Sequence, residues 1–405
     1  MNVLAVNVGS TSLKFRLFDM PAEIVLASGR IERVGDRLSP VTWQARDGVR
    51  RRDERSCPDQ RASIALAIEL LTGGEEPSLA SIGDLACVAF KAVHAEGISD
   101  TVIFDEGVLD AMAEYVPLAP MHNPPYIEAV RVFRDVAPTV PLVGVFEPAF
   151  HQTIPERART YAIPWRWTEK YRIRRYGFHG ASHRYVASHV PQLLGRPNDS
   201  LRIISCHLGG SSSVCAIDAG RSRDTSMGFS TQSGLPHATR SGDLDPFIPL
   251  YLMRKEGLDP EQVGHILATE GGLTGISGVG GDVRDLQWAA ASGDDRAALA
   301  LDVFVYELQK YVGAYYVVLG GLDVLALTGG IGENDVVLRA RICAGLSALG
   351  VELDAERNEC VGQEGVISKP ESRVTVTVIA ANEEVVIARE AIKLLGAAAL
   401  GIVGR

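Results

Sequence analysis

The sequence lacks the features that mark several classes of protein. No apolar run approaches the ~18 residues needed to span a bilayer, and the first residues have no basic segment leading into an apolar stretch, as a secretory signal would. The six cysteines include no C-x-x-C pair, so we expect reduced thiols in the core. Positive charge is in deficit, and a net charge of −10 argues against nucleic-acid binding. These absences predict a cytoplasmic protein that binds small molecules, with no nucleic-acid or membrane partner.

The chain is long and ordinary in composition. With 405 residues it exceeds the ~250 to 300 residues at which a single core usually divides. Its apolar fraction of 46% and charged fraction of 22% are typical of globular proteins. We therefore expect two domains with a cleft between them.

The stretch "VLAVNVGSTSLKFRLFDM" (3–20) predicts two strands joined by a turn rich in hydroxyl groups. Residues 3–8 are mostly apolar, as in a buried strand, and residues 13–18 largely alternate. The turn holds Gly9 and three hydroxyl side chains, so its hydroxyls and N–H groups form a surface suited to phosphate oxygens.

A second stretch, "IISCHLGGSSSVCAI" (203–217), repeats this arrangement of strand, glycine, hydroxyl residues and strand. Recurrence over so long a separation indicates a duplicated domain, because the repeats of a solenoid recur every ~20 to 50 residues. The sequence thus predicts two phosphate-binding hairpins that face one cleft.

The rest of the chain alternates strand-like and helix-like segments, which indicates a mixed α/β fold. A polar, Arg-rich loop is expected near 46–56. We expect an N-terminal domain of residues 1–148 and a C-terminal domain of residues 149–382. Asn382 precedes a terminal helix, 383–405, which is expected to pack back on the first domain.

The stretch "DVLALTGGIGEN" (323–334) predicts a glycine-rich turn after a strand. Its three glycines let the backbone approach a ligand closely, which suits contact with a purine or a ribose. The turn matches neither the Walker nor the Rossmann pattern, and neither occurs elsewhere in the chain. The alternative interpretation is an ordinary corner between a strand and a helix.

Two histidines in "RYGFHGASHRYV" (175–186), His179 and His183, are four residues apart and could bind a metal from one face of a helix. Gly177 and Gly180 argue against a regular helix there. We therefore prefer a catalytic electrophile for His179 on a loop, and a buried, hydrogen-bonded role for His183.

Two further stretches carry charged side chains that suit phosphate chemistry. Arg240 in "HATRSGDLDP" (237–246) could clamp a phosphoryl group, or could pair with Asp243 or Asp245. Glu383 and its neighbour in "AANEEVVIARE" (380–390) could hold magnesium, although acidic residues are favoured in the first turn of any helix.

Ten short motifs occur along the chain in the order and spacing seen in acetate kinases: NVGSTSLK, MHNPP, FHQTIP, YGFHGASH, HLGGSSS, TSMGF, TRSGDLDP, GISG, TGGIGEN and NEE. On these motifs, which extend over essentially the whole chain, the sequence resembles the acetate and propionate kinase family. The resemblance implies two duplicated ribonuclease-H-like domains of the actin, sugar kinase and Hsp70 type. It also implies a homodimer that uses Mg²⁺ or Mn²⁺ to transfer the γ-phosphoryl group of ATP reversibly to a short-chain carboxylate, giving an acyl phosphate and ADP.

The resemblance assigns roles to individual residues. Those implied in catalysis are His122, Glu147, His179 and Arg240, and those implied at the carboxylic acid are Lys91, Val93, Met121, Phe178 and Thr231. The nucleotide is expected to contact Asn7, Ser10, Ser12, Lys14, His207, Leu208, Gly209, Gly210, Ser211, Ser212, Asp282, Arg284, Gly329, Gly330, Ile331, Gly332 and Asn334. The metal ion is expected near Asn7 and Glu383.

The chain departs from the family pattern mainly on the substrate side. Lys91 stands where the family has an arginine, Glu147 where it has an aspartate, Gly210 where it has an asparagine and Thr231 where it has a proline. Lysine keeps the charge but loses the fork of donors. Three hypotheses therefore remain: an acetate or propionate kinase, a kinase for another small acid, or a nucleotide-binding relative with little transfer activity. We also expect the changes at positions 91 and 147 to compensate each other.

Overall fold

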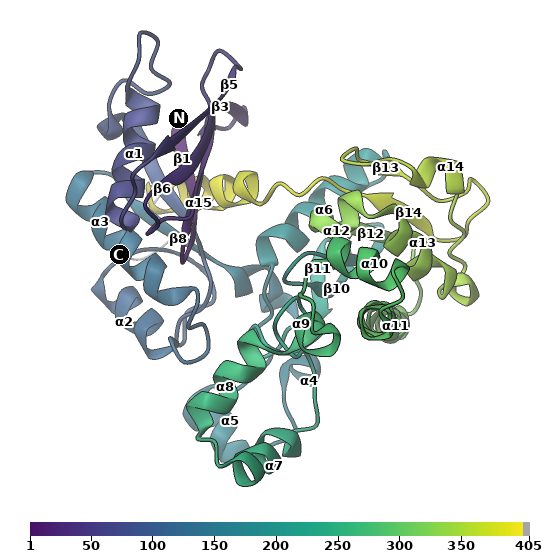
Figure 1. The fold of residues 1–405 in the computed structure, drawn as a ribbon. Coiled ribbons are helices and arrows are strands. Elements are labelled where there is room, and N and C mark those ends of the chain that lie inside the picture. The colour runs from purple at the N-terminus through teal and green to yellow at the C-terminus, as the bar shows by residue number, and fades with distance from the viewer. Residues whose placement is uncertain (400–405) are drawn as a thin grey trace. The chain divides into compact units, whose positions relative to one another are not determined.

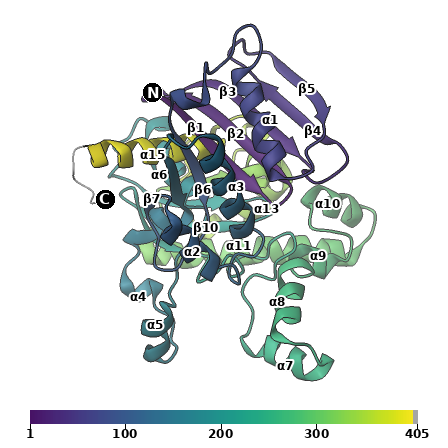
Figure 2. The same ribbon diagram turned by 90° about the vertical axis from the view of Figure 1, so that its left-hand side faces the viewer.

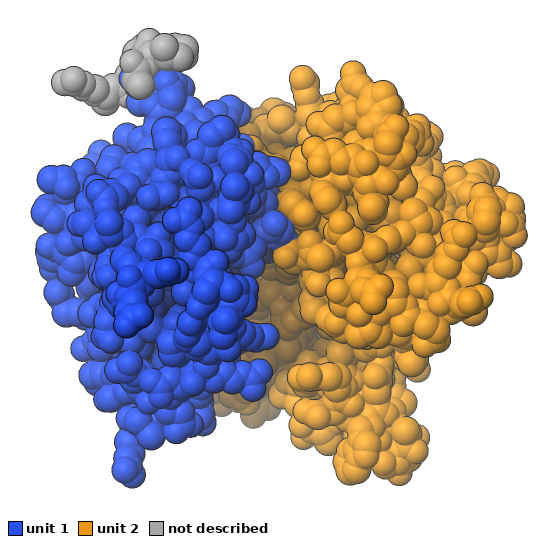
Figure 3. Space-filling view, turned by 90° about the horizontal axis from the view of Figure 1, so that it is seen from above, with its two compact units in different colours: residues 1–149, 382–405 blue, residues 150–381 orange. Residues whose placement is uncertain are grey.

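The computed structural model describes residues 1–399, which divide into two compact units. Unit 1 contains residues 1–149 and the described residues from Asn382 onward, and unit 2 contains residues 150–381 (Figure 3). Unit 2 is one continuous segment of the chain, whereas unit 1 combines the N-terminal segment with the last helix.

Unit 1 is built on an eight-stranded sheet in the order β5-β4-β3-β2-β1-β6-β8-β7. The strands β1 to β5 are antiparallel neighbours, whereas β6 is parallel to both β1 and β8. The strands are β1 (Asn2–Gly9), β2 (Ser12–Asp19), β3 (Ile24–Glu32), β4 (Ser39–Gln44), β5 (Arg50–Arg55), β6 (Leu85–Ala92), β7 (Thr101–Ile103) and β8 (Leu142–Phe146).

Helices cover the two faces of this sheet. The helices are α1 (Gln60–Thr72), α2 (Glu106–Glu114), α3 (Asn123–Val136) and α15 (Glu383–Ala399). Figure 1 shows α1 and α3 on one side of the sheet and α15 on the other, where it packs on β1, β6 and β8. Both faces of β1 and β6 are therefore buried, which explains why these strands are apolar runs without alternation.

The Arg-rich segment expected to be a loop near 46–56 is a strand, β5, over Arg50–Arg55, so that expectation is wrong for this part and holds only for the residues around it. The strand β5 pairs antiparallel with β4, from Gln44 opposite Arg50 to Ser39 opposite Arg55. It lies at the edge of the sheet and nearly all of its residues are exposed. Charged side chains on an edge strand discourage pairing with other chains, which accounts for a composition that resembles a loop.

Unit 2 repeats the strand order of unit 1. Its six-stranded sheet runs β11-β10-β9-β12-β14-β13, with β9, β10 and β11 antiparallel and β9, β12 and β14 parallel. The order β3-β2-β1-β6-β8 in unit 1 has the same directions, so the expected duplicated α/β fold is confirmed. The strands are β9 (Arg202–His207), β10 (Ser213–Asp218), β11 (Arg221–Thr225), β12 (Val324–Thr328), β13 (Gly365–Val366) and β14 (Thr375–Val378).

The helices of unit 2 surround its sheet. They are α4 (Glu156–Arg159), α5 (Trp165–Tyr171), α6 (Gly180–Leu193), α7 (Phe247–Glu256), α8 (Pro260–Thr269), α9 (Gly272–Ser277), α10 (Val283–Ala291), α11 (Asp295–Leu319), α12 (Gly329–Asn334), α13 (Val336–Ala344) and α14 (Ala355–Asn358). Figure 1 shows α6 on one side of the sheet and the long α11 on the other, where α11 contributes Phe304 and Leu308 to the core. Figure 2 shows α4–α5 and α7–α8 as two separate projections from unit 2.

The cysteines are free, and five of the six are buried. Cys206 and Cys215, on the strands of the second hairpin, are fully buried, and burial raises the pKa of both thiols. Within residues 1–399, no helix is both long enough and apolar enough to cross a bilayer.

Candidate active site

A buried tyrosine forms hydrogen bonds with the end of β1 in the first hairpin. The hydroxyl of Tyr126, on α3, donates to Asn7 Oδ1 (3.0 Å) and accepts from the Val8 N–H (3.1 Å). The Gln60 side-chain amide donates to the carbonyl of Gly9 (2.8 Å). Burial raises the pKa of Tyr126, so its hydroxyl keeps its proton and donates to Asn7. The amide oxygen of Asn7 is thereby fixed at the end of β1.

Two strand ends and the start of α15 bring three charged side chains together in unit 1. Lys91 Nζ lies 3.5 Å from Glu147 Oε1 and forms a closer ion pair with the carboxylate of Glu383. The Glu147 residue is only 4% exposed. Burial alone would lower the pKa of Lys91, but the two carboxylates outweigh it and raise that pKa, so the ammonium stays charged.

Three other predicted residues of unit 1 lie just after β6 or just before α3. Val93 is buried just after β6, whereas the side chain of Met121 is 56% exposed before α3. His122 is the residue that precedes the first turn of α3.

The turn of the second hairpin is closed by its own side chains. The Ser212 hydroxyl donates to the Gly209 carbonyl (3.0 Å) and accepts from the Gly209 N–H (3.1 Å). The Ser212 N–H donates to Nδ1 of the buried His237 (3.0 Å). The pKa of His237 is lowered to about 3, mainly by burial, so this ring is a neutral acceptor. His237 is a site residue that the sequence interpretation missed.

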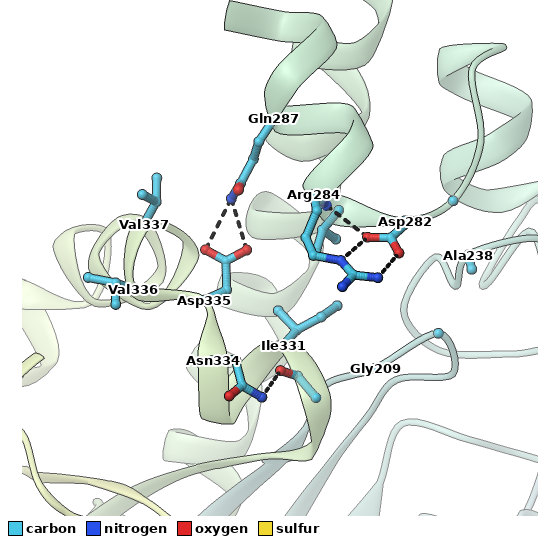
Figure 4. Close-up of a pocket in the computed structure, with 14 residues that line it drawn as sticks. Gly209, Ala238, Asp282, Arg284, Gln287, Ile331, Asn334, Asp335, Val336 and Val337 are labelled. Atoms are coloured by element: carbon cyan, nitrogen blue, oxygen red, sulfur yellow. Dashed lines mark hydrogen bonds and ion pairs between the residues drawn. The ribbon is translucent and has the colours of Figure 1, made fainter. Parts of the chain in front are cut away.

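A cavity of about 780 Å³ lies beside this turn in unit 2 (Figure 4). This volume lies within the ~300 to 1,000 Å³ typical of small-molecule sites. Seven of the predicted nucleotide residues line it: Gly209, Gly210, Asp282, Arg284, Gly330, Ile331 and Asn334. The other predicted nucleotide residues of unit 2 are not among its lining residues: His207, Leu208, Ser211, Ser212, Gly329 and Gly332.

Paired polar side chains stand along the wall of this cavity. Arg284 donates to Asp282 (Nε to Oδ1, 2.9 Å), and this contact lowers the pKa of Asp282 to about 2. The Gln287 amide donates to both carboxylate oxygens of Asp335, and Asn334 Nδ2 donates to the Gly330 carbonyl (2.9 Å; Figure 4). Neither Gln287 nor Asp335 was predicted, because the resemblance assigned no role to either position.

Gly329 lets two backbone segments cross at the edge of the cavity. Its φ of 78° is left-handed, and a Cβ there would lie 2.6 Å from the Leu208 carbonyl oxygen. The Leu208 N–H donates to Thr328 and the Ile331 N–H donates to Leu208. Gly329 therefore does not line the cavity, but its lack of a side chain permits the close backbone packing beside the cavity wall.

His179 precedes the first turn of α6 with a left-handed φ of 53°, which is uncommon for a residue other than glycine. Its Nδ1 lies 2.8 Å from Ser213 Oγ, and the same oxygen lies 2.8 Å from Nε2 of His183. His183 is fully buried and hydrogen-bonded, as its preferred interpretation stated. The ring of His207 lies 4.2 Å from that of His179, between centroids.

The Arg240 guanidinium donates to the carbonyl of Thr231 (2.7 Å). Among the described residues no ion pair joins it to Asp243 or Asp245: Asp243 accepts from the Gly234 N–H and the Tyr311 hydroxyl, and Asp245 from a backbone N–H. Burial lowers the pKa of Arg240 to about 10, so it remains a cation at neutral pH.

The remaining predicted residues have these surroundings. Phe178 is buried, and its carbonyl accepts from Nε2 of His151, whose pKa burial lowers to about 4. Thr231 is buried beside Arg240. Ser10 is exposed at the tip of the first hairpin, and Ser12 pairs with Gly9 at the base of that turn.

Comparison with known proteins gives matches over nearly the whole chain. Residues 2–389 match the Acetokinase family. The chain is 45% identical over 397 residues to an acetate kinase of Dictyoglomus turgidum, covering 98% of each chain. It is 44% identical to an acetate kinase of Carboxydothermus hydrogenoformans, covering 98% of this chain and 99% of the relative.

Solved structures give the same relationship. The acetate kinase of Porphyromonas gingivalis superposes with a TM-score of 0.86 at 38% identity, covering 97% of this chain and 99% of that one. A propionate kinase from Francisella tularensis gives a TM-score of 0.87 at 33% identity, covering 96% and 98%.

Proposed function

The chain belongs to the acetokinase family and is a kinase that phosphorylates a short-chain carboxylate with ATP, and on this premise we propose that acetate is its substrate. The named substrate of its relatives supports acetate, and the cavity in unit 2, built from the second hairpin and the turn after β12, is the structural observation that supports ATP. Its glycines expose backbone where a nucleotide would lie, and its volume suits a ligand of that size.

The proposed reaction needs no general base. A carboxylic acid with a pKa of ~4 to 5 is already ionised at pH 7, so its oxygen can attack the γ-phosphorus directly. The new bond joins this oxygen to phosphorus, the bond from the γ-phosphorus to the bridging oxygen breaks, and ADP leaves with the electron pair. Such a transfer depends on positioned donors and cations. We assign these roles to His179, Arg240 and His122.

We propose that Asn7 and Glu383, with Glu147 close by, hold a divalent cation. The donor set fits such an ion, because amide and carboxylate oxygens are the ligands that Mg²⁺ and Mn²⁺ prefer. The two carboxylates already attract one cation, the ammonium of Lys91. The bound metal would neutralise charge on the phosphates of ATP. Tyr126 would keep the Asn7 oxygen in place for it.

We assign the acyl group to Val93, Met121, Phe178 and Thr231, and its carboxylate to Lys91. The replacement of arginine by lysine at position 91 supports a second candidate, a kinase adapted to another small acid. Because lysine offers a point charge and not a planar fork, it recognises the geometry of a carboxylate less strictly.

We propose that the protein is a cytoplasmic homodimer. Exposed aromatic side chains support the dimer: Trp165 is 59% and Trp167 43% exposed on α5, and Phe247 is 73% and Tyr251 60% exposed on α7. Exposed apolar residues that are close together on one helix, as on α5 and again on α7, are typical of protein contact surfaces. ATP as substrate and free thiols are both consistent with the cytoplasm.

A panel of short carboxylic acids with MgATP, trapping the acyl phosphate with hydroxylamine, tests the substrate. Acetate is expected to give the highest kcat/KM. A higher value for propionate or a larger acid would replace acetate with the second candidate. ATP binding without product from any acid would instead indicate a nucleotide-binding relative with little transfer activity.

A further inference from the structure

A continuous chain of hydrogen bonds joins Ser205, His183, Ser213 and His179 in unit 2. Ser205 Oγ lies 2.9 Å from His183 Nδ1, His183 Nε2 lies 2.8 Å from Ser213 Oγ, and Ser213 Oγ lies 2.8 Å from His179 Nδ1. The two serines are on neighbouring strands, β9 and β10, and the two histidines are at the start of α6. The chain therefore links the core of the sheet to the ring of His179.

The interior members of this chain are neutral and shielded from water. Ser205, His183 and Ser213 are all fully buried. Burial also lowers the pKa of His183 well below its ordinary value. A neutral imidazole has one N–H donor and one acceptor nitrogen. The hydrogen bonds can therefore run in only two ways: each group donates toward His179, or each group donates toward Ser205.

The buried end of the chain distinguishes the two directions. Across residues 1–399, Ser205 Oγ has no hydrogen-bond partner other than His183 Nδ1. If His183 donated from Nδ1, the hydroxyl hydrogen of Ser205 would be buried without an acceptor, which is costly. If Ser205 donates to Nδ1, His183 donates from Nε2 to Ser213, and Ser213 donates to His179 Nδ1. The side-chain polar atoms of Ser205, His183 and Ser213, and Nδ1 of His179, then all have a hydrogen-bond partner.

We propose that Ser205, His183 and Ser213 are positioning residues that hold His179 as the neutral tautomer with its proton on Nε2. A hydroxyl that donates to Nδ1 leaves Nε2–H as the single donor of the ring. Resting on the proposed function, this donor is the group that stabilises charge developing on the transferred phosphoryl oxygens. The serine and histidine side chains beneath it also fix the ring on a left-handed backbone position.

The neighbouring His207 follows the same rule. Ser182 Oγ lies 2.8 Å from His207 Nδ1, and this hydroxyl has no second partner in the described part of the chain. Ser182 is buried, so its hydrogen must go to Nδ1 and the His207 proton to Nε2. In two adjacent rings, His179 and His207, the ring proton is thus assigned to Nε2.

The tautomer can be measured directly on the whole protein with ¹⁵N-labelled histidine. Imidazole spectra distinguish a protonated from an unprotonated ring nitrogen, and His179→Asn identifies the signals of His179 among those of the nine histidines. We expect a protonated Nε2 and an unprotonated Nδ1 for His179. A protonated Nδ1 in the wild-type protein would overturn the proposal. This readout needs no turnover, so it stands apart from the identity of the substrate.

Two variants test the direction of the chain and its effect. Ser205→Ala removes the hydroxyl that sets the direction, so the Nδ1–H tautomer of His179 should appear; an unchanged tautomer would contradict the proposal. Ser213→Ala should lower kcat ~10- to 100-fold, the effect typical of losing a group that orients an active-site ligand. The KM for ATP should change much less, and Ser213→Thr, which restores the hydroxyl, should recover kcat.

Ser222→Ala is the matched control. Ser222 is also fully buried and its hydroxyl also contacts a histidine nitrogen, Nδ1 of His151 (2.9 Å), but it is not a member of the hydrogen-bond chain from Ser205 to His179. This variant should keep the His179 tautomer and most of kcat. If Ser213→Ala lowers kcat no more than Ser222→Ala does, the positioning role is refuted.

Discussion

Lys91 Nζ lies 3.5 Å from Glu147 Oε1, and the same ammonium pairs with Glu383. The two positions at which the resemblance implies the largest departures from the family pattern are therefore in contact. Glu147 reaches ~1.5 Å further than an aspartate would, and a displacement of ~1 Å can cost 10²-fold in rate. A flexible lysine can follow that displaced carboxylate, whereas a rigid arginine fork cannot.

We predict from this contact that the two changes compensate each other. The single reversions Lys91→Arg and Glu147→Asp should each fail to improve acetate turnover, and the double reversion should recover more than the sum of the two. The double-mutant cycle is measured as kcat with normal ATP binding in every variant. Additive effects, with Glu147→Asp alone raising activity, would indicate a degenerating site and would refute the pairing.

Arg240→Ala should lower acyl phosphate formation by ~10² or more, as does the loss of a preorganised donor to a transition state. The reason is that its half-buried cation is the phosphoryl clamp assigned in unit 2. Arg223, which pairs with Asp218 (2.9 Å) and is partly exposed, provides the control. Because exposed pairs contribute little, Arg223→Ala should be near wild type. Wild-type turnover in folded Arg240→Ala would remove the assignment.

Adjacent glycines should separate stability from nucleotide binding. Gly329→Ala places a Cβ 2.6 Å from the Leu208 carbonyl oxygen at a left-handed φ, so it should lower the melting temperature. Gly330 lines the cavity, and a Cβ there would meet no protein atom within 4 Å. Gly330→Ala should therefore raise the KM for ATP with little change in melting temperature. If instead Gly330→Ala lowered the melting temperature and left the KM for ATP unchanged, while Gly329→Ala raised that KM, the cavity would not be the ATP site.

Acid should destabilise the protein through its buried histidines. The pKa of His151 is lowered from 6.5 to about 4, mainly by burial. Between these two values the unfolded chain binds a proton that the folded chain does not, so the free energy of unfolding falls as the pH falls. The loss over this interval is about 3 kcal/mol for this group. Burial lowers the pKa of His183 and His237 in the same direction, which adds to the effect.

Urea unfolding between about pH 7 and about pH 5 measures this dependence. His151→Gln should reduce the slope of stability against pH by up to one proton. An equal slope in wild type and His151→Gln would show that this histidine does not couple to folding.

Light scattering at micromolar concentration should give twice the chain mass of 43.5 kDa. Phe247→Glu, which places a charge on the exposed face of α7, should lower the mass toward that of a single chain. Val49→Glu, at an exposed apolar residue of unit 1, is the control and should leave the mass unchanged. A monomer mass for the wild type would contradict the proposed homodimer.

The sequence was sufficient to predict those elements whose residue pattern lies within one short segment of the chain. Both hairpins could be predicted because apolar strands and hydroxyl-rich turns lie next to each other in the chain. The strand β5 could not, because its six residues are charged and only pairing with β4 at the edge of the sheet makes them a strand. Propensity is a weak guide where backbone pairing decides.

The candidate site shows the same limit. Family motifs pointed to Asn7, His179 and Arg240, but not to Tyr126, which holds Asn7 from 119 residues away. Ser213 was within a quoted motif, yet its place between two histidines depends on the packing of α6 against the sheet. Contacts of this kind join distant segments, and no local pattern encodes them.

The return of α15 to unit 1 has a consequence for biosynthesis. A ribosome finishes residues 150–381 before it makes Glu383–Ala399, so unit 2 can fold while the sheet of unit 1 still lacks the helix that packs on β1, β6 and β8. Apolar strands left uncovered during this delay are prone to aggregation. The unit that is translated first can therefore be completed only after the last helix has been made.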